Sequence, residues 1–133
     1  MVCEMWNDGM VKGIGIDSVD IDEMRRLCSD LEGPFVRRVF TAAERAQAIE
    51  RHDPAQVFAG KFAAKEAAFK ALVQHTEGGF DLRIIETLED ANGAPHITLT
   101  GSLAPILQQT GVTELLVSIT NERDLATAIV LAQ

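Results

Sequence analysis

The chain contains few cysteines and few histidines, and it has no long apolar segment. Of its 133 residues, 2 are cysteines and 3 are histidines, and neither type has the spacing of a disulfide framework or a zinc site. No apolar run approaches the length of a membrane-spanning helix, and residues 1–9 lack the basic and then apolar form of a signal peptide. These absences predict a cytoplasmic protein with reduced thiols and no membrane association.

Basic residues are a minority, and they are concentrated in one part of the chain. The formal net charge of −8 at pH 7 argues against a nucleic-acid or anionic-membrane binder, because such proteins present a basic surface. Nevertheless, 6 of the 12 Lys and Arg residues lie between Arg25 and Arg51, and three more are Lys61, Lys65 and Lys70. We therefore expect this stretch to contact an anion.

The length and the order of the predicted elements indicate one α+β domain over residues 1–133, with residues 1–9 as a short N-terminal extension. A buried strand is predicted over 11–16, and start signals and periodicity predict helices over 21–31, 41–51 and 54–73. Alternating patterns then predict strands over 82–88, 96–100, 114–120 and 125–131, and a short helix spans 103–107. We therefore expect helices in the N-terminal half to pack on an antiparallel sheet.

One glutamate lies on the apolar side of the long helix predicted around residues 58–72. Glu66 follows Phe62 by four residues and precedes Phe69 by three, which puts it within the apolar stripe. A carboxylate that faces a core is costly unless a cation pairs with it, and that cation is either Lys70 or a metal ion. The simpler alternative is a surface Glu66–Lys70 pair that only stabilises the helix.

A second carboxylate ends the first predicted strand. Asp17 either caps the following helix or acts as a ligand in a site. Ser18 and Asp20 are better placed to cap that helix, which leaves Asp17 available. Two carboxylates from separate elements, with lysines beside one of them, are typical of a Mg²⁺ site that binds phosphate groups. From the residues alone we predict a Mg²⁺-assisted phosphoryl-transfer site.

Three segments closely resemble those of one enzyme family. They are G-I-G-I-D-S-V-D-I at 13–21, R-V-F-T-A-A-E at 38–44 and F-A-G-K-F-A-A-K-E-A-A-F-K-A-L at 58–72. Together with G-A-P at 93–95 and V-S-I-T at 117–120, they resemble the holo-acyl-carrier-protein synthase family, the small class of 4′-phosphopantetheinyl transferases. The resemblance covers nearly the whole chain after the N-terminal extension.

The resemblance implies transfer of 4′-phosphopantetheine from coenzyme A, the co-substrate, to a serine of an apo acyl carrier protein, with release of adenosine 3′,5′-bisphosphate. It also implies Mg²⁺ as the cofactor, a homotrimer with sites between subunits, and carriers of fatty-acid or polyketide biosynthesis. A non-catalytic module that binds coenzyme A or a carrier is the main alternative. An unrelated Mg²⁺-dependent phosphoryl-transfer enzyme is a third.

The resemblance assigns roles to individual residues as well. Asp17 and Glu66 match the family's metal ligands and belong to the implied catalytic set. Lys70 matches a lysine that contacts the phosphates, and Lys61 a basic position near the nucleotide. The remaining residues predicted for catalysis or coenzyme A binding are Lys65, Thr120 and Asn121. The acceptor of the serine proton stays open between Glu66, Lys65 and a metal-bound water.

The chain departs from the family pattern at three places. Asn121 stands where family members often have histidine, and residues 73–76 replace a common Gly-Thr-Gly in the loop on the pantetheine side. The first helix, which presents arginines to the acidic carrier in the family, begins here with acidic residues. Carrier docking is then expected to depend on Arg25, Arg26, Arg37 and Arg38. These departures suggest a dedicated carrier, and none of them changes Asp17 or Glu66.

Overall fold

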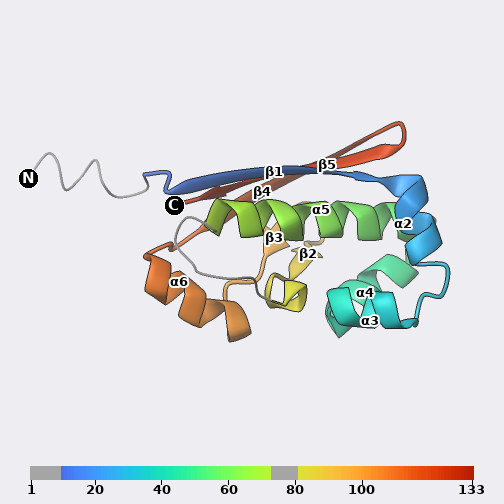
Figure 1. Cartoon of the computed structure of the whole chain (residues 1–133), viewed down its shortest axis with the longest axis horizontal. Coiled ribbons are helices and arrows are strands. Elements are labelled where there is room, and N and C mark those ends of the chain that lie inside the picture. The colour runs from blue at the N-terminus through green and yellow to red at the C-terminus, as the bar shows by residue number, and fades with distance from the viewer. Residues whose placement is uncertain (1–9, 73–80) are drawn as a thin grey trace, which may run out of the picture.

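The 19-residue helix α5 (Pro54–Leu72) lies at the centre of the fold. The computed structural model describes residues 10–72 and 81–133. Figure 1 shows a sheet of three long strands on one side of α5, and the shorter helices and a small hairpin on the other. The helices around α5 are α2 (Ile21–Leu27), α3 (Pro34–Val39), α4 (Ala42–Ile49) and α6 (Ala104–Thr110), with 3₁₀ turns η2 (Leu82–Ile84) and η3 (Gly101–Leu103).

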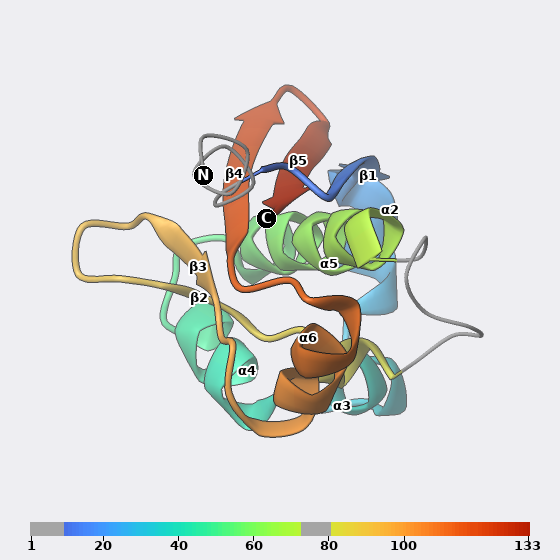
Figure 2. The same cartoon turned by 90° about the vertical axis from the view of Figure 1, so that its left-hand side faces the viewer.

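The main sheet is antiparallel and has the strand order β1-β5-β4. Its strands are β1 (Gly13–Asp20), β4 (Leu115–Glu122) and β5 (Leu125–Ala132), and both β1 and β4 pair with β5. A separate hairpin joins β2 (Thr87–Glu89) to β3 (Pro95–Ile97), and Figure 2 shows it projecting from the body of the protein. The predicted α+β class, with helices packed on an antiparallel sheet, is confirmed.

The first strand is longer than its apolar run suggests. All eight residues of β1, Gly13 to Asp20, pair with β5, so Asp17 lies within the strand and not at its end. The pairing continues past Ile16 because polar residues also fit the ladder; the hydroxyls of Ser18 and Thr127 lie 2.8 Å apart across the two strands. Because Asp17 lies within the strand, strand alternation fixes the side of β1 to which its side chain points.

Two glycines let β1 lie unusually close to α5. A Cβ on Gly13 would lie 2.0 Å from the carbonyl oxygen of Ala71, and one on Gly15 would lie 1.9 Å from that of Ala67. Only glycine permits such an approach between a strand and a helix backbone. Since side chains alternate along a strand, Asp17 shares the α5-facing side of β1 with both glycines. The G-I-G-I-D motif therefore brings a carboxylate to this helix.

The helix start signals are confirmed, whereas two other local predictions are wrong. The Asp20 side chain accepts from Glu23 N at 3.0 Å and caps α2, and Thr41 and Glu44 form both bonds of a capping box. However, α2 ends at Leu27, and the strand expected over 82–88 is a 3₁₀ turn followed by the short β2.

Among the described helices, none is both long and apolar enough to cross a membrane.

Candidate functional site

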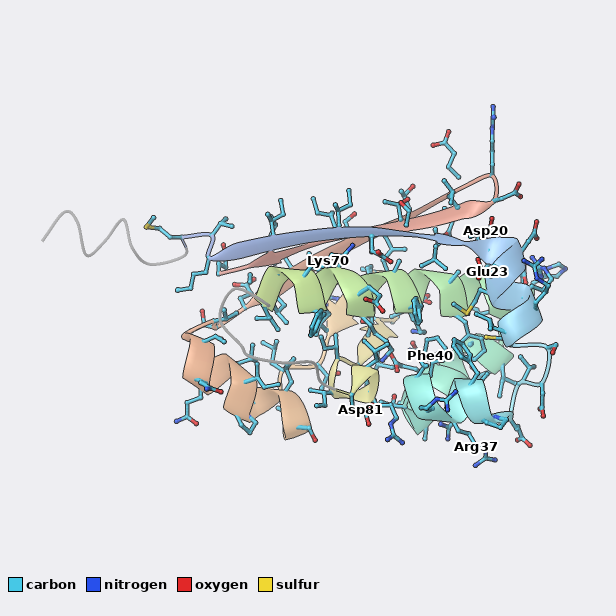
Figure 3. All side chains as sticks on the ribbon, viewed as in Figure 1. Asp20, Glu23, Arg37, Phe40, Lys70 and Asp81 are labelled. Atoms are coloured by element: carbon cyan, nitrogen blue, oxygen red, sulfur yellow. The ribbon has the colours of Figure 1, made fainter. Side chains whose placement is uncertain are left out.

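Asp17 and Lys70 form an ion pair between β1 and α5. The Lys70 ammonium donates to Asp17 Oδ1 at 3.0 Å and to the carbonyl oxygen of Ile16 at 3.1 Å. Figure 3 shows Lys70 between the helix and the strand. The lysine side chain is 51% exposed, so its charge remains open to solvent and to ligands. The simpler alternative was a surface Glu66–Lys70 pair that only stabilises the helix. Lys70 instead forms its ion pair with Asp17.

Glu66 is half-buried and lies in the wall of the same cavity as Asp17. This cavity, named here the Glu66 cavity, is bounded by β1, α2, α3 and α5. Burial raises the pKa of Glu66, and the nearby Asp17 carboxylate raises it further, against the opposite effect of Lys70. A cation would therefore stabilise the Glu66 charge beside Asp17.

The donor set of this site fits Mg²⁺. Among the described residues, no group of three or more His, Cys, Asp or Glu side chains could hold a metal ion, so Asp17 and Glu66 act as a pair. Mg²⁺ in proteins is commonly held by one or two carboxylates and keeps its other positions for water and substrate phosphates. Zinc sites have three or four protein ligands, many of them His or Cys, so the pair fits a hard cation better.

A second and larger cavity lies beside the N-terminal half of α5. This Lys61 cavity is bounded by α5, β4 and the β2–β3 hairpin, and Lys61 and Asn121 both line it. Lys61 is buried, and its ammonium donates at 2.8 Å to Gln47 Oε1 and at 2.8 Å to the carbonyl oxygen of Thr87, which uses two of its three N–H groups. Burial lowers the pKa of Lys61. Arg51 and Glu89 form an ion pair in the same wall.

Lys65 does not join the site, contrary to its predicted role in catalysis and coenzyme A binding. Its side chain is fully buried, and its ammonium bonds Glu44 Oε1 at 2.7 Å and the carbonyl oxygens of Leu82 and Ile85 at 2.9 and 2.6 Å. Burial lowers the pKa of Lys65, while Glu44 opposes that effect. Because three acceptors use all three N–H donors, this lysine holds α4 and η2 to α5.

Thr120 also lies away from both cavities. It is exposed on the outer side of β4, opposite the side that contacts α5, because it alternates with Ile119 and Asn121, which line the Lys61 cavity. Within one chain, Thr120 therefore lines neither cavity, and its predicted contact with coenzyme A stays a prediction. The altered loop at residues 73–76 lies outside the described residues.

The four predicted docking arginines have different surroundings. Arg25 forms a two-point ion pair with Asp53, with N–O distances of 2.7 and 3.1 Å. The other three are exposed on α2 and α3: Arg26, Arg37 and Arg38. Figure 3 shows Arg37 pointing away from α5. These three remain available as a basic surface for an acidic partner.

Several residues that shape the Glu66 cavity were not found from the sequence. Met24, Leu27, Phe35 and Phe62 line it beside Asp17 and Glu66. Phe35 belongs to α3, a helix that was not predicted from the sequence. Pro34 in its first turn is a helix start signal that could have indicated it. Leu27 belongs to the apolar periodicity that predicts the helix over 21–31, but that periodicity does not show that its side chain, 45% exposed, borders a cavity.

The sequence comparison identifies the family. Residues 13–130 match the model of the 4′-phosphopantetheinyl transferase superfamily. The chain belongs to this superfamily. The holo-[acyl-carrier-protein] synthase of Syntrophus aciditrophicus is 36% identical over 93% of this chain and 97% of the relative. The resemblance stated from the sequence motifs, and with it membership of an enzyme family, is confirmed.

Solved structures agree with this assignment. The chain is similar to the holo-[acyl-carrier-protein] synthase of Neisseria meningitidis with a TM-score of 0.82 and 31% identity, over 93% of this chain and 99% of the other. It is also similar to a synthase–coenzyme A complex from Chronobacterium ammoniagenes, with a TM-score of 0.77 and 33% identity, over 91% and 96% of the two chains. The chain thus shares its fold with proteins that bind coenzyme A.

Proposed function

We propose that this protein transfers 4′-phosphopantetheine from coenzyme A to a serine of an apo acyl carrier protein. The serine oxygen forms a bond to the pyrophosphate phosphorus next to the pantetheine arm. The bond from that phosphorus to the bridging oxygen breaks, adenosine 3′,5′-bisphosphate leaves with the electron pair, and the serine loses its proton. The observation that carries this proposal is the Asp17–Glu66 pair in the cavity wall of a chain from this superfamily.

Each part of the site has a place in the proposed reaction. Asp17 and Glu66 would hold Mg²⁺, which supplies positive charge to the pyrophosphate oxygens. Lys70 is half-exposed beside Asp17 and would bind the same phosphates. The nucleotide end would occupy the Lys61 cavity, where Lys61 has an N–H to donate and Asn121 has an amide. Lys65 does not fit the role of proton acceptor, since it is an ammonium paired with Glu44.

The carrier is proposed to dock where α2 and α3 border the Glu66 cavity. Arg26, Arg37 and Arg38 are exposed on these two helices and would bind acidic side chains of the carrier. The apolar lining at Leu27 and Phe35 gives the pantetheine arm or the carrier a surface to pack on. The serine hydroxyl then approaches the Asp17–Glu66 pair from the open side of the cavity.

A homotrimer is proposed on the basis of the outer face of the main sheet. Five apolar side chains are exposed on this face, with exposed fractions between 37% and 59%: Ile14, Ile16, Leu116, Leu125 and Ile129. Exposed apolar side chains gathered on one face of a sheet mark an interaction surface. Light scattering coupled to size exclusion is expected to give three times the chain mass, and Ile16→Glu is expected to give monomers. A native chain that elutes as a monomer would contradict this assembly.

The transfer itself is tested by mass spectrometry of the carrier. The protein is incubated with coenzyme A, Mg²⁺ and a panel of apo acyl carrier proteins, and the mass of each carrier is measured. We expect the mass of at least one carrier to increase by one phosphopantetheine group, and adenosine 3′,5′-bisphosphate to appear in equal amount. Binding of coenzyme A with no gain of mass on any carrier would favour a non-catalytic binding module.

A further inference from the structure

One ion pair links the predicted docking helix to the wall of the Lys61 cavity. Asp53 lies in that wall, directly before α5, whereas Arg25 projects from α2 outside it. The guanidinium donates through Nη1 to Asp53 Oδ1 at 2.7 Å and through Nη2 to Oδ2 at 3.1 Å. Such a fork-shaped contact is stronger and more specific in direction than a single hydrogen bond. Arg25 is therefore already occupied by a group of its own chain.

Asp53 is an unexpected residue in a cavity proposed to accept an anion. The charged residues in the wall are Arg51, Asp53, Lys61 and Glu89, two cations and two anions. Arg51 is paired with Glu89, and Lys61 already donates to two acceptors. The hydrogen bond from Arg25, together with its charge, lowers the pKa of Asp53, so this carboxylate is ionised near neutral pH. An unpaired carboxylate here would repel phosphate groups.

We propose that Arg25 is a positioning residue for coenzyme A and not a docking residue for the carrier: by holding and neutralising Asp53, it makes the Lys61 cavity fit for a phosphate-bearing nucleotide. This inference rests on the proposed function, because it takes the cavity as the site of the nucleotide end. Arg25 acts through Asp53 and needs no contact with the ligand. An acidic carrier group would have to displace Asp53 to bind Arg25, at the cost of two hydrogen bonds.

The structure supplies matched variants for the test. Arg25→Gln removes the charge and leaves Asp53 unpaired, while Asp53→Asn removes the repulsive charge and keeps a residue that caps helices well. Arg83 and Asp81 form a second two-point pair at the surface, with side chains 50% and 42% exposed against 52% and 30% for Arg25 and Asp53. Neither residue of this second pair lines the Lys61 or the Glu66 cavity. Arg83→Gln is therefore the control for loss of a surface ion pair.

Coenzyme A binding to the full chain is measured by calorimetry, without a carrier and at constant salt. Arg25→Gln is expected to weaken binding about fivefold, the scale of one partly exposed charge interaction. Adding Asp53→Asn to Arg25→Gln is expected to restore the native affinity, and Arg83→Gln is expected to change nothing. In turnover assays, Arg25→Gln should raise KM for coenzyme A while KM for the carrier stays constant.

Three results would overturn the inference. They are unchanged coenzyme A affinity in Arg25→Gln, failure of Asp53→Asn to restore it, and a rise in KM for the carrier alone. The third result would return Arg25 to the docking surface. If the native chain binds no coenzyme A at all, the proposed function fails, and this inference fails with it. Native binding with an unaffected Arg25→Gln variant defeats the inference alone, so the two failures are distinguishable.

Discussion

Two faces of helix α5 each carry two charged residues. Groups of the chain itself bond the charges of one face more completely than those of the other. On one face, Lys61 and Lys65 are buried and donate to acceptors on α4, η2, β2 and the residue after η2. On the other face, Glu66 and Lys70 border the strand β1 and remain open to a ligand. In both pairs the residues are four positions apart, so spacing does not explain the difference.

The difference lies in how many partners the chain itself provides. Glu44 accepts from Lys65 Nζ and from the N–H groups of Thr41 and Thr87, so both members of the buried ion pair are fully hydrogen-bonded. Burial of charges is tolerated only with such complete pairing. Asp17 and Glu66 are two carboxylates, and Lys70 is the one cation that pairs with them among the described residues. The pKa of Glu66 is therefore raised, first by burial and then by the Asp17 charge. Lys65 is thus fully bonded by groups of its own chain and Lys61 is bonded by two acceptors, whereas the charge of Glu66 is left for a ligand.

The largest expected effect follows from removing the Glu66 charge. Glu66→Gln keeps the shape of the side chain but weakens its binding of a divalent cation, so we expect kcat/KM for transfer to fall by at least about a hundredfold, the scale of a lost electrostatic contact to the reacting phosphate. The melting temperature should not fall, since the charge is half-buried without a full set of partners. Near-native turnover would show that Glu66 does not hold the metal ion.

The opposite pattern is expected for the buried face. Lys65→Met leaves the Glu44 charge buried without its cation, and we expect the free energy of unfolding to fall by about 3 kcal/mol, as measured by urea denaturation. Lys65→Met combined with Glu44→Gln is expected to recover part of this loss. Where the variant remains folded, its KM for coenzyme A should match that of the native chain. A large increase in KM with unchanged stability would put Lys65 back in the site.

A smaller effect is expected at Lys70. Lys70→Gln removes a cation that pairs with Asp17 and is proposed to bind phosphate, and we expect kcat/KM to fall about tenfold while stability changes little, because exposed ion pairs contribute little to folding. The comparison is made with Arg83→Gln, which also breaks an exposed ion pair. Equal activity in the two variants would exclude Lys70 from phosphate binding.

The smallest expected effect is at Thr87 of β2, whose carbonyl accepts from Lys61 on the buried face of α5. Its hydroxyl is buried and has no hydrogen-bond partner among the described residues. Thr87→Val replaces this hydroxyl with a methyl group of similar volume, so we expect the free energy of unfolding to rise by up to about 1 kcal/mol. A decrease in stability would show that the hydroxyl has a partner, such as a bound water.

Helix start signals and periodicity account for most of the local structure that could be predicted from the sequence. The capping box of α4 and the Asp20 cap depend on residues close together in the chain, so the sequence determines them locally. The end of β1 depends on pairing with β5, more than a hundred residues later. It was predicted at residue 16, four residues before the observed end at Asp20, so Asp17 was not expected inside the strand. The 3₁₀ turn at Leu82–Ile84 was predicted as a strand from its alternating pattern. In the structure the Leu82 carbonyl of this turn accepts from Lys65, a contact that no local pattern reveals.

The same limit applies to the candidate site. Glu66 was identified because periodicity puts it within the apolar stripe of its helix. Asp17 was identified because it follows a buried strand, while Ser18 and Asp20 are better placed to cap the next helix. Lys65 could not be separated from Lys61 and Lys70 by residue type, since only the position of Glu44 on α4 decides its partner. The Arg25–Asp53 contact joins α2 to the start of α5, and sequence patterns do not report pairs of this kind.

The most direct test of the difference between the two faces is metal binding. Mn²⁺, a paramagnetic substitute for Mg²⁺, is titrated into the chain in the presence of coenzyme A, and free Mn²⁺ is measured by electron paramagnetic resonance. We expect one ion to bind per chain, binding to be strongly weakened in Asp17→Asn and in Glu66→Gln, and native binding in Glu44→Gln wherever that variant is folded. Native Mn²⁺ binding by Glu66→Gln, or its loss in folded Glu44→Gln, would contradict the assignment of the open face of α5 to the metal site.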